Sequence, residues 1–120
     1  MSRSGRRAAV RLATLLTTTG TLHFVAPKQF DAIVPSALPG SARFWTYASG
    51  VVELGLAGLL AVPRTRWVGG TLAAAFFVAV FPGNIKSVKV ARHPALKAVA
   101  VARLPMQVPL VRQALAAREG

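Results

Sequence analysis

One acidic residue stands inside an apolar run, where a carboxylate cannot simply meet water. Glu53 is the only charged residue of the stretch GVVELGLAGLL, and the other acids of the chain are Asp31 and Glu119. A bare carboxylate in the middle of a membrane costs about 3 kcal/mol or more. We therefore expect Glu53 to be protonated, hydrated or paired with another polar group.

Four further polar residues lie in or beside apolar stretches, Arg103 near the middle of its stretch and His23 and Asn84 near matching ends of theirs. Glu53 lies at the centre of its apolar stretch. Arg103 is its natural partner, because it lies only about two residues, ~3 Å, from the centre of the last apolar stretch and therefore at a similar depth. Gln107 follows Arg103 by one helical turn and lies on the same helix face. We predict one buried polar cluster, to which each long helix contributes: His23, Glu53, Asn84, Arg103 and Gln107. The cluster is either a structural Glu–Arg pair that fixes which helices are neighbours or a ligand-binding site.

Catalytic and metal chemistry have little support in the sequence. The chain has no cysteine, so it holds no disulfide, no thiol redox pair and no thiolate ligand for a metal. Two histidines alone are a poor metal site. No nucleophile and base stand at a spacing that indicates catalysis, and we predict neither a catalytic residue nor a metal site.

The composition indicates a membrane protein rather than a nucleic-acid-binding one. The formal net charge is +12, which first suggests nucleic acid, yet 53% of the residues are hydrophobic. The charges fall mostly between long apolar stretches instead of along every helix. That distribution places lysine and arginine at the anionic lipid headgroups of a bilayer.

Four stretches approach the roughly 20 residues that a helix needs to cross the hydrocarbon. They predict an all-α fold for the whole chain, a four-helix transmembrane bundle, with spans at residues 8–26, 44–62, 67–85 and 94–115. The first stretch has the alternative of a cleaved signal peptide. The last contains Arg103 and two prolines, and its alternative is an amphipathic helix on the membrane surface.

A short proline-bounded segment joins the first two spans. Between residues 27 and 35, Phe30, Ile33 and Val34 fall on one side of two helical turns and Asp31 on the other. This pattern predicts a short interfacial helix, or lid, over the polar cluster. An ordinary surface loop is the competing interpretation.

Two other patterns have two interpretations each. Lys86, Lys89 and Arg92 recur at helical spacing, so the third helix either continues into the interface or gives way to a basic loop. Small residues four apart, Gly69 with Ala73 and Gly70 with Ala74, indicate close helix contacts. These contacts lie within one bundle or, alternatively, at a dimer face, and we expect a monomer or a small homo-oligomer.

Several segments of the chain together resemble the DoxX-like family of small bacterial membrane proteins. They are GTLHFVAPKQFDAIVPSALPG, YASGVVELGLAGLL with its PRTR turn, FPGNI and RLPMQ. The resemblance covers most of the chain, from Gly20 to about Gln107, and Gly83 replaces the alanine usual in FPAN. It implies four transmembrane helices, a location in the bacterial cytoplasmic membrane and, in some branches, association with redox enzymes. The positive-inside rule favours cytoplasmic termini.

These observations lead to two hypotheses of function, and a third, catalysis within the membrane, has no set of residues that supports it. The first is a non-catalytic subunit or scaffold of a membrane redox or stress-response assembly, with a redox enzyme as partner and no nucleic acid. Its small polar pocket would admit a quinone-like or lipid-like ligand, and we predict no other cofactor. The alternative is a small proton-linked carrier or permease in which Glu53 titrates.

Overall fold

The structure is a computed structural model that describes residues 2–120, and this part of the chain folds into helices without any strand. The all-helical prediction is therefore confirmed. The elements in chain order are α1 (Arg3–Val25), α2 (Pro27–Asp31), α3 (Ala42–Ala61), the 3-10 turn η1 (Pro63–Thr65), α4 (Arg66–Ala79), α5 (Phe81–Val90) and α6 (Pro94–Ala117).

Local sequence explains where the long helices begin. The side chains of Ser2 and Ser41 accept hydrogen bonds from backbone amides in the first turns of α1 and α3, which is the usual role of serine before a helix. His93 caps α6 in the same way through Nδ1. Pro94 follows it in the first turn, where the missing N–H of proline is harmless.

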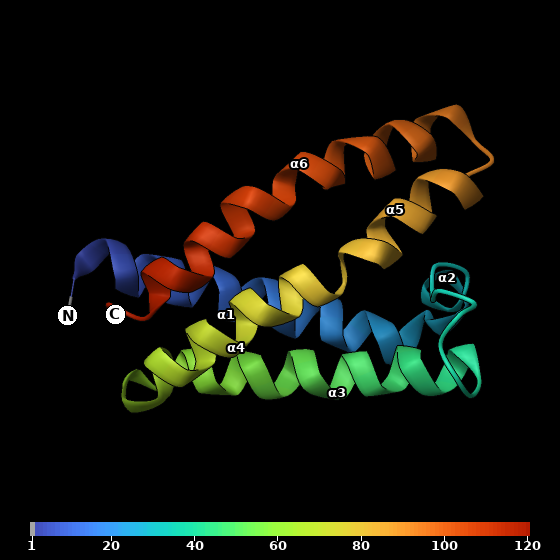
Figure 1. Ribbon diagram of the computed structural model, residues 1–120. Helices are drawn as coiled ribbons and strands as arrows, with labels where there is room; N and C mark the ends of the chain where they lie inside the picture. The colour runs from blue at the N-terminus through green and yellow to red at the C-terminus, as the bar shows by residue number, and fades with distance from the viewer. Residues whose placement is uncertain (1) are drawn as a thin grey trace.

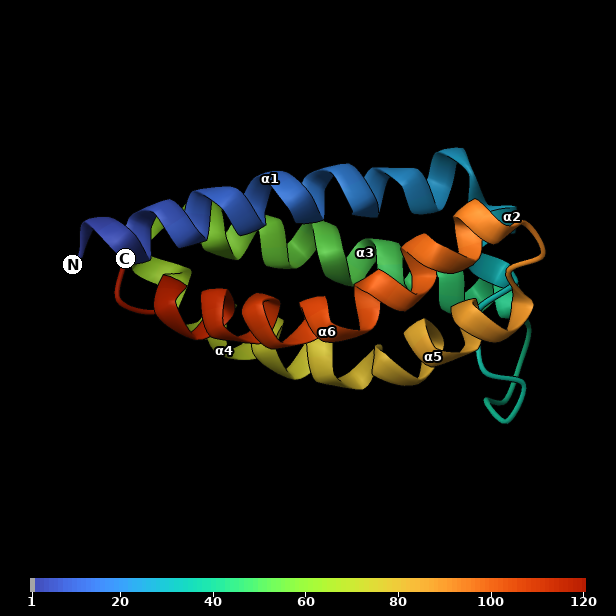
Figure 2. The same cartoon turned by 90° about the horizontal axis from the view of Figure 1, so that it is seen from above.

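The long helices form a ring in which each has two neighbours (Figures 1 and 2). Helix α1 packs against α3 and α6, and α4 packs against the same two helices. Helices α3 and α6 therefore lie diagonally across the bundle. The two chain ends meet at one end of it, where the amide of Ser2 donates to the carbonyl of Glu119 at 2.7 Å. The short helix α2 lies at the opposite end.

The third predicted span is bent rather than straight. Helix α4 ends at Ala79 and α5 begins at Phe81. Pro82 follows directly, and a proline in this position cannot donate a backbone hydrogen bond to the preceding turn. Helix α5 then continues to Val90, so Lys86 and Lys89 are helical, whereas Arg92 lies in the short connection to α6.

The last predicted segment is helical from Pro94 to Ala117 and contains both Pro105 and Pro109. It packs along α4, α1 and α5 and is part of the bundle. Its beginning is less covered than its end, because residues 94–99 are all exposed whereas Ala114 and Ala117 are fully buried. In Figure 1, α5 and the start of α6 diverge from α1 and α3 at the end of the bundle that carries α2.

The interior is built from small and aliphatic side chains, whereas many large apolar side chains lie outside. Leu12, Leu16 and Leu60 are almost completely buried together with several alanines. Two helical stretches are long and apolar enough to cross a membrane, Ala42–Ala61 and Pro63–Val90, and only 33% and 28% of their most apolar windows are buried. A core helix of a soluble protein would be mostly buried, so these stretches support a membrane location.

Glycines permit the closest helix contacts, and they do so within one bundle. A side chain at Gly69 would meet Leu59 of α3, and one at Gly70 would meet the backbone of Ala114 in α6. Gly50 of α3 is equally tight, because an added Cβ would lie 2.8 Å from the Cβ of His23 in α1. The small residues thus serve contacts between helices of the same chain.

We expect Gly50→Ala to lower the free energy of unfolding by about 1–3 kcal/mol, because the new methyl group must push α1 away from α3. Gly55→Ala is the matched control, since no atom lies within 4 Å of its added Cβ. That change should leave stability unaltered or raise it by up to about 1 kcal/mol. Unfolding of both variants in detergent micelles measures the difference, and equal stabilities would contradict the close α1–α3 contact.

Candidate functional site

Glu53 has its polar neighbours on α1. The hydroxyl of Thr19 donates to Oε1 of Glu53 at 3.0 Å, and Nδ1 of His23 lies 3.0 Å from Oε2. Glu53 and His23 are only 7% and 8% exposed. The buried carboxylate is therefore supported by two polar side chains that stand one helical turn apart on the neighbouring helix.

The helix surfaces explain why these groups meet. Thr46, Gly50 and Glu53 share the face of α3 that turns toward α1, because they recur at intervals of four and three residues. Gly50 leaves room for His23, and Gly20 of α1 leaves room for Glu53, whose Cβ would lie 3.2 Å from a Cβ on that glycine. Two glycines thus bring the two helices close enough for short side chains to bond.

The position of His23 assigns its ring hydrogen. Nδ1 lies 2.7 Å from the backbone carbonyl of Thr19 and 3.0 Å from Oε2 of Glu53, and both of these are acceptors. A ring nitrogen between two acceptors carries a hydrogen. The carbonyl is the better-aligned partner, since Oε2 of Glu53 is buried and has no hydrogen bond of good geometry.

Arg103 does not pair with Glu53, contrary to the expectation from depth alone. Its Nη2 donates to Oδ1 of Asn84 at 3.2 Å, and Nε2 of Gln107 donates to the backbone carbonyl of Phe77 at 2.6 Å. The reason is the order of the helices. Arg103 and Gln107 belong to α6, which adjoins α4 and α5, whereas Glu53 belongs to α3 on the diagonal.

The predicted cluster is thus two groups of contacts. One contains His23 and Glu53, joined by Thr19, and the other contains Asn84 with Arg103. Gln107 is used in bundle packing, because the carbonyl that it binds lies in the last turn of α4, where a helix runs short of its own donors.

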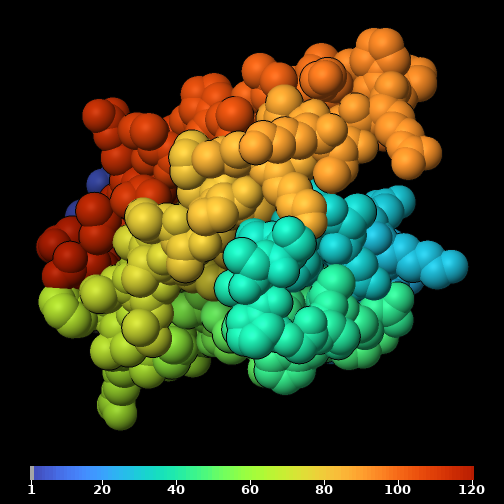
Figure 3. Space-filling model, turned by 45° about the vertical axis from the view of Figure 1, so that its right-hand side comes forward, coloured from blue at the N-terminus to red at the C-terminus, as the bar shows by residue number. Residues whose placement is uncertain are grey.

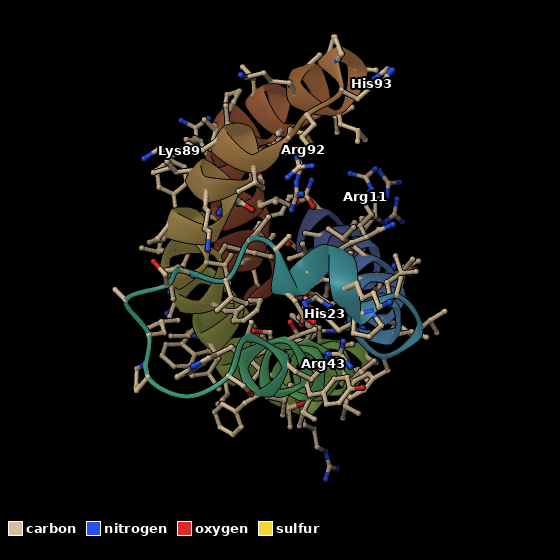
Figure 4. The ribbon with its side chains drawn as sticks, turned by 90° about the vertical axis from the view of Figure 1, so that its right-hand side faces the viewer. Arg11, His23, Arg43, Lys89, Arg92 and His93 are labelled. Carbon is tan, nitrogen blue, oxygen red and sulfur yellow. The ribbon has the colours of Figure 1, made fainter. Side chains whose placement is uncertain are left out.

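The segment between α1 and α3 covers the first group. Helix α2 is one turn and a half long, and the ring of Phe30 stacks on His23 with centroids 3.8 Å apart. Asp31 accepts hydrogen bonds from Thr46 at 2.6 Å and from Arg43 at 3.0 Å. Figure 4 looks onto this end, with His23 beneath the helical turn and Arg43 beside it.

The hydroxyl of Thr46, and after it the guanidinium of Arg43, hold the pKa of Asp31 below its ordinary value. The same segment also reaches α5, since Nζ of Lys86 donates to the carbonyl of Val34. The carbonyl of Ile33 faces Gly83. Phe30 and Asp31 therefore contact the bundle through their side chains, and Ile33 and Val34 through their carbonyls.

Sequence reasoning missed the two threonines of the site. Thr19 lies one turn before His23, and Thr46 lies two turns before Glu53 on the same face. That spacing was the available signal. It is weak, because a threonine in a helix ordinarily bonds to the carbonyl four residues back, as Thr14, Thr17 and Thr18 do.

The hydrogen bonds of the site start from α1. Thr19 donates to the carboxylate of Glu53, and His23 donates to the backbone carbonyl of Thr19. Within residues 2–120, no three side chains of histidine, cysteine, aspartate or glutamate converge in a way that would hold a metal ion. What the site offers is a pair of buried titratable groups beneath an aromatic cover.

Comparison with known proteins places the chain in a family. Residues 12–118 match the model of a family described as "Domain of unknown function (DUF8561)". The chain belongs to the DUF8561 family. No curated protein and no solved structure matches it. The match spans every helix from α2 to α6 completely and α1 from Leu12 onward, so the polar contacts above lie within the DUF8561 domain.

For this DUF8561 domain, a double-mutant cycle tests which residue supports Glu53. We expect His23→Ala and Glu53→Ala to be coupled by about 1 kcal/mol or more in unfolding free energy, because the two side chains are in contact. Arg103→Ala and Glu53→Ala should add to within about 0.5 kcal/mol, because they lie on diagonal helices. Unfolding in mixed micelles measures both cycles. Strong coupling of Arg103 instead of His23 would contradict the structure.

Proposed function

We propose that this protein is a multi-pass membrane protein in which α1, α3, the bent pair α4–α5 and α6 are four antiparallel spans. The apolar outer surface is the observation that carries the proposal. Large exposed apolar side chains lie on the middle of the helices, among them Leu15, Val51, Val52, Leu72 and Val78. Helix α3, with 20 residues, is about 30 Å long, which matches the hydrocarbon core of a bilayer.

The charges at the two ends support the same proposal. Arg3, Arg6 and Arg7 are exposed on the first turns of α1, where the chain ends meet. Lys89, Arg92 and Arg43 lie at the other end (Figure 4). Two basic ends around an apolar middle suit a bilayer with anionic headgroups. We place both termini in the cytoplasm, with α2 at the outer face of a bacterial cytoplasmic membrane.

The function that the site supports best is a non-catalytic one. We propose a DoxX-like subunit or scaffold of a membrane redox or stress-response assembly, whose polar site holds a quinone-like or lipid-like molecule. The proposal is supported by a coincidence: the motifs that resemble the DoxX-like family contain His23, Glu53, Asn84 and Arg103, the residues that make polar contacts between helices.

One observation favours a second candidate, a small proton-linked carrier. Glu53 and His23 are two titratable groups in contact, both buried, and Phe30 covers them from one end. Intramembrane pairs of this kind are typical of proton relays. In a carrier, Glu53 would take up and release the proton, and movement of α2 would open the site.

Single-cysteine labelling tests the four-span topology, and the native chain is a suitable background because it has no cysteine. We expect a membrane-impermeant maleimide to label Ser36→Cys in intact cells and Ser2→Cys only after permeabilisation. Val52→Cys, on the apolar face of α3, should stay unlabelled until detergent is added. Labelling in the reverse order would invert the orientation, and equal labelling of all three sites would contradict a membrane-spanning bundle.

Glu53→Gln separates the scaffold from the carrier. For a scaffold, the variant should remain folded and recover the same proteins by affinity purification in mild detergent. For a carrier, it should abolish proton flux into proteoliposomes, reported by a pH-sensitive dye. Glu119→Gln is the control, because this carboxylate lies at the end where the termini meet. Recovery of the chain alone, without flux, would count against both candidates.

A further inference from the structure

Among residues 2–120, no carboxylate forms an ion pair with Arg103. The chain contains three acidic residues. Asp31 is bound by Thr46 and Arg43, and Glu53 is bound by Thr19 and faces His23. Glu119 follows the last turn of α6, far along the helix from Arg103. Because a guanidinium stays charged at any physiological pH, its counter-ion must come from outside the protein.

The position of Arg103 along α6 makes a missing counter-ion costly. Arg103 is nine residues after Pro94, the first residue of α6, and therefore about 14 Å into the helix at 1.5 Å per residue. Glu53 is eleven residues into α3, about 16 Å from the same end. In the proposed membrane arrangement, on which this inference rests, Arg103 thus lies near the middle of the hydrocarbon. An unpaired charge at that depth is strongly unfavourable.

The side chain faces an opening in the bundle. Ala100 and Gln107 lie one turn before and one turn after Arg103 on nearly the same face of α6, and both are buried, yet Arg103 is exposed. In Figure 1 the α5–α6 hairpin leans away from α1 at the end of the bundle that carries α2. Figure 3 shows a notch between the start of α6 and the segment that contains α2.

Two features of the opening define what would fill it. Arg103 and Asn84 supply polar donors and an acceptor side by side, with Asn84 only 6% exposed. Leu96 and Val99, two turns and one turn before Arg103 on the same side of α6, are 62% and 58% exposed. A cationic centre beside bare apolar surface matches a molecule with an anionic head and an apolar chain.

We propose that this opening binds a long-chain carboxylic acid, with the carboxylate on Arg103 and Asn84 and the alkyl chain against Leu96 and Val99. A carboxylate matches the planar fork of a guanidinium. In its neutral form the acid can enter hydrocarbon, and the guanidinium favours the ionised form, whose proton must pass to water at the membrane surface. Two other ligand classes fit less well. A phosphodiester lipid stays charged, so its head remains at the depth of the headgroups. A ligand with a neutral carbonyl would leave the charge of Arg103 unbalanced.

The test uses the full chain in phosphatidylcholine nanodiscs with radiolabelled oleate. We expect saturable binding that Arg103→Gln weakens about tenfold or more, as loss of a charge-assisted pair implies. Arg103→Lys keeps the charge but loses the fork and should give an intermediate affinity. Arg112→Gln is the control, because Arg112 is exposed on the same helix nine residues away and should leave binding unchanged.

Competition identifies the chemical class. Oleyl alcohol, which has the same chain without the charge, should not displace oleate. Displacement by the alcohol, displacement by phosphatidylglycerol at equal concentration, or unchanged binding in a folded Arg103→Gln variant would each overturn the proposal. Cysteine labelling keeps the two proposals apart: a protein that spans the membrane but binds no oleate refutes only the ligand, and a protein that does not span it refutes both.

Discussion

The contact between α1 and α3 at Glu53 is the interaction on which the rest of the structure depends. A carboxylate among apolar residues is tolerable only if polar groups reach it. Thr19 donates to it and His23 lies 3.0 Å from it, because Gly20 and Gly50 remove the side chains that would keep the helices apart. The same contact commits His23 to α3 and leaves its ring under Phe30. Packing of two glycines therefore determines the electrostatics of the buried site.

This arrangement leaves Arg103, on the other side of the bundle, without a carboxylate partner in the part of the chain that the structure describes. Since Glu53 is already supported from α1, Arg103 bonds to the neutral amide of Asn84 and retains its charge. A basic chain with three acids cannot neutralise its own arginines. In the proposed membrane arrangement, Arg103 near mid-depth is the most costly of them to leave unpaired. The excess of basic over acidic residues is therefore the reason that we expect an anionic molecule at the open side of α6.

Particular residues show how far sequence reasoning reached. The helical character, the short proline-bounded helix and the burial of His23, Glu53 and Asn84 followed from hydrophobic runs, prolines and the rarity of polar residues within them. The bend before Pro82 and the role of Thr19 did not follow. A proline signals a bend without giving its direction, and the hydroxyl of a threonine can bond to its own helix just as well as to a neighbour.

The sequence by itself determined the position of each polar group along its helix, because distance along a helix is counted in residues. That knowledge put Glu53 and Arg103 at the same depth, and it was sufficient to identify both as unusual. Only the tertiary structure decided that α1 adjoins α3 while α6 lies across the diagonal. Neighbour order depends on which helix faces fit together, here through small residues and bends, and a linear pattern of apolar residues contains no such information.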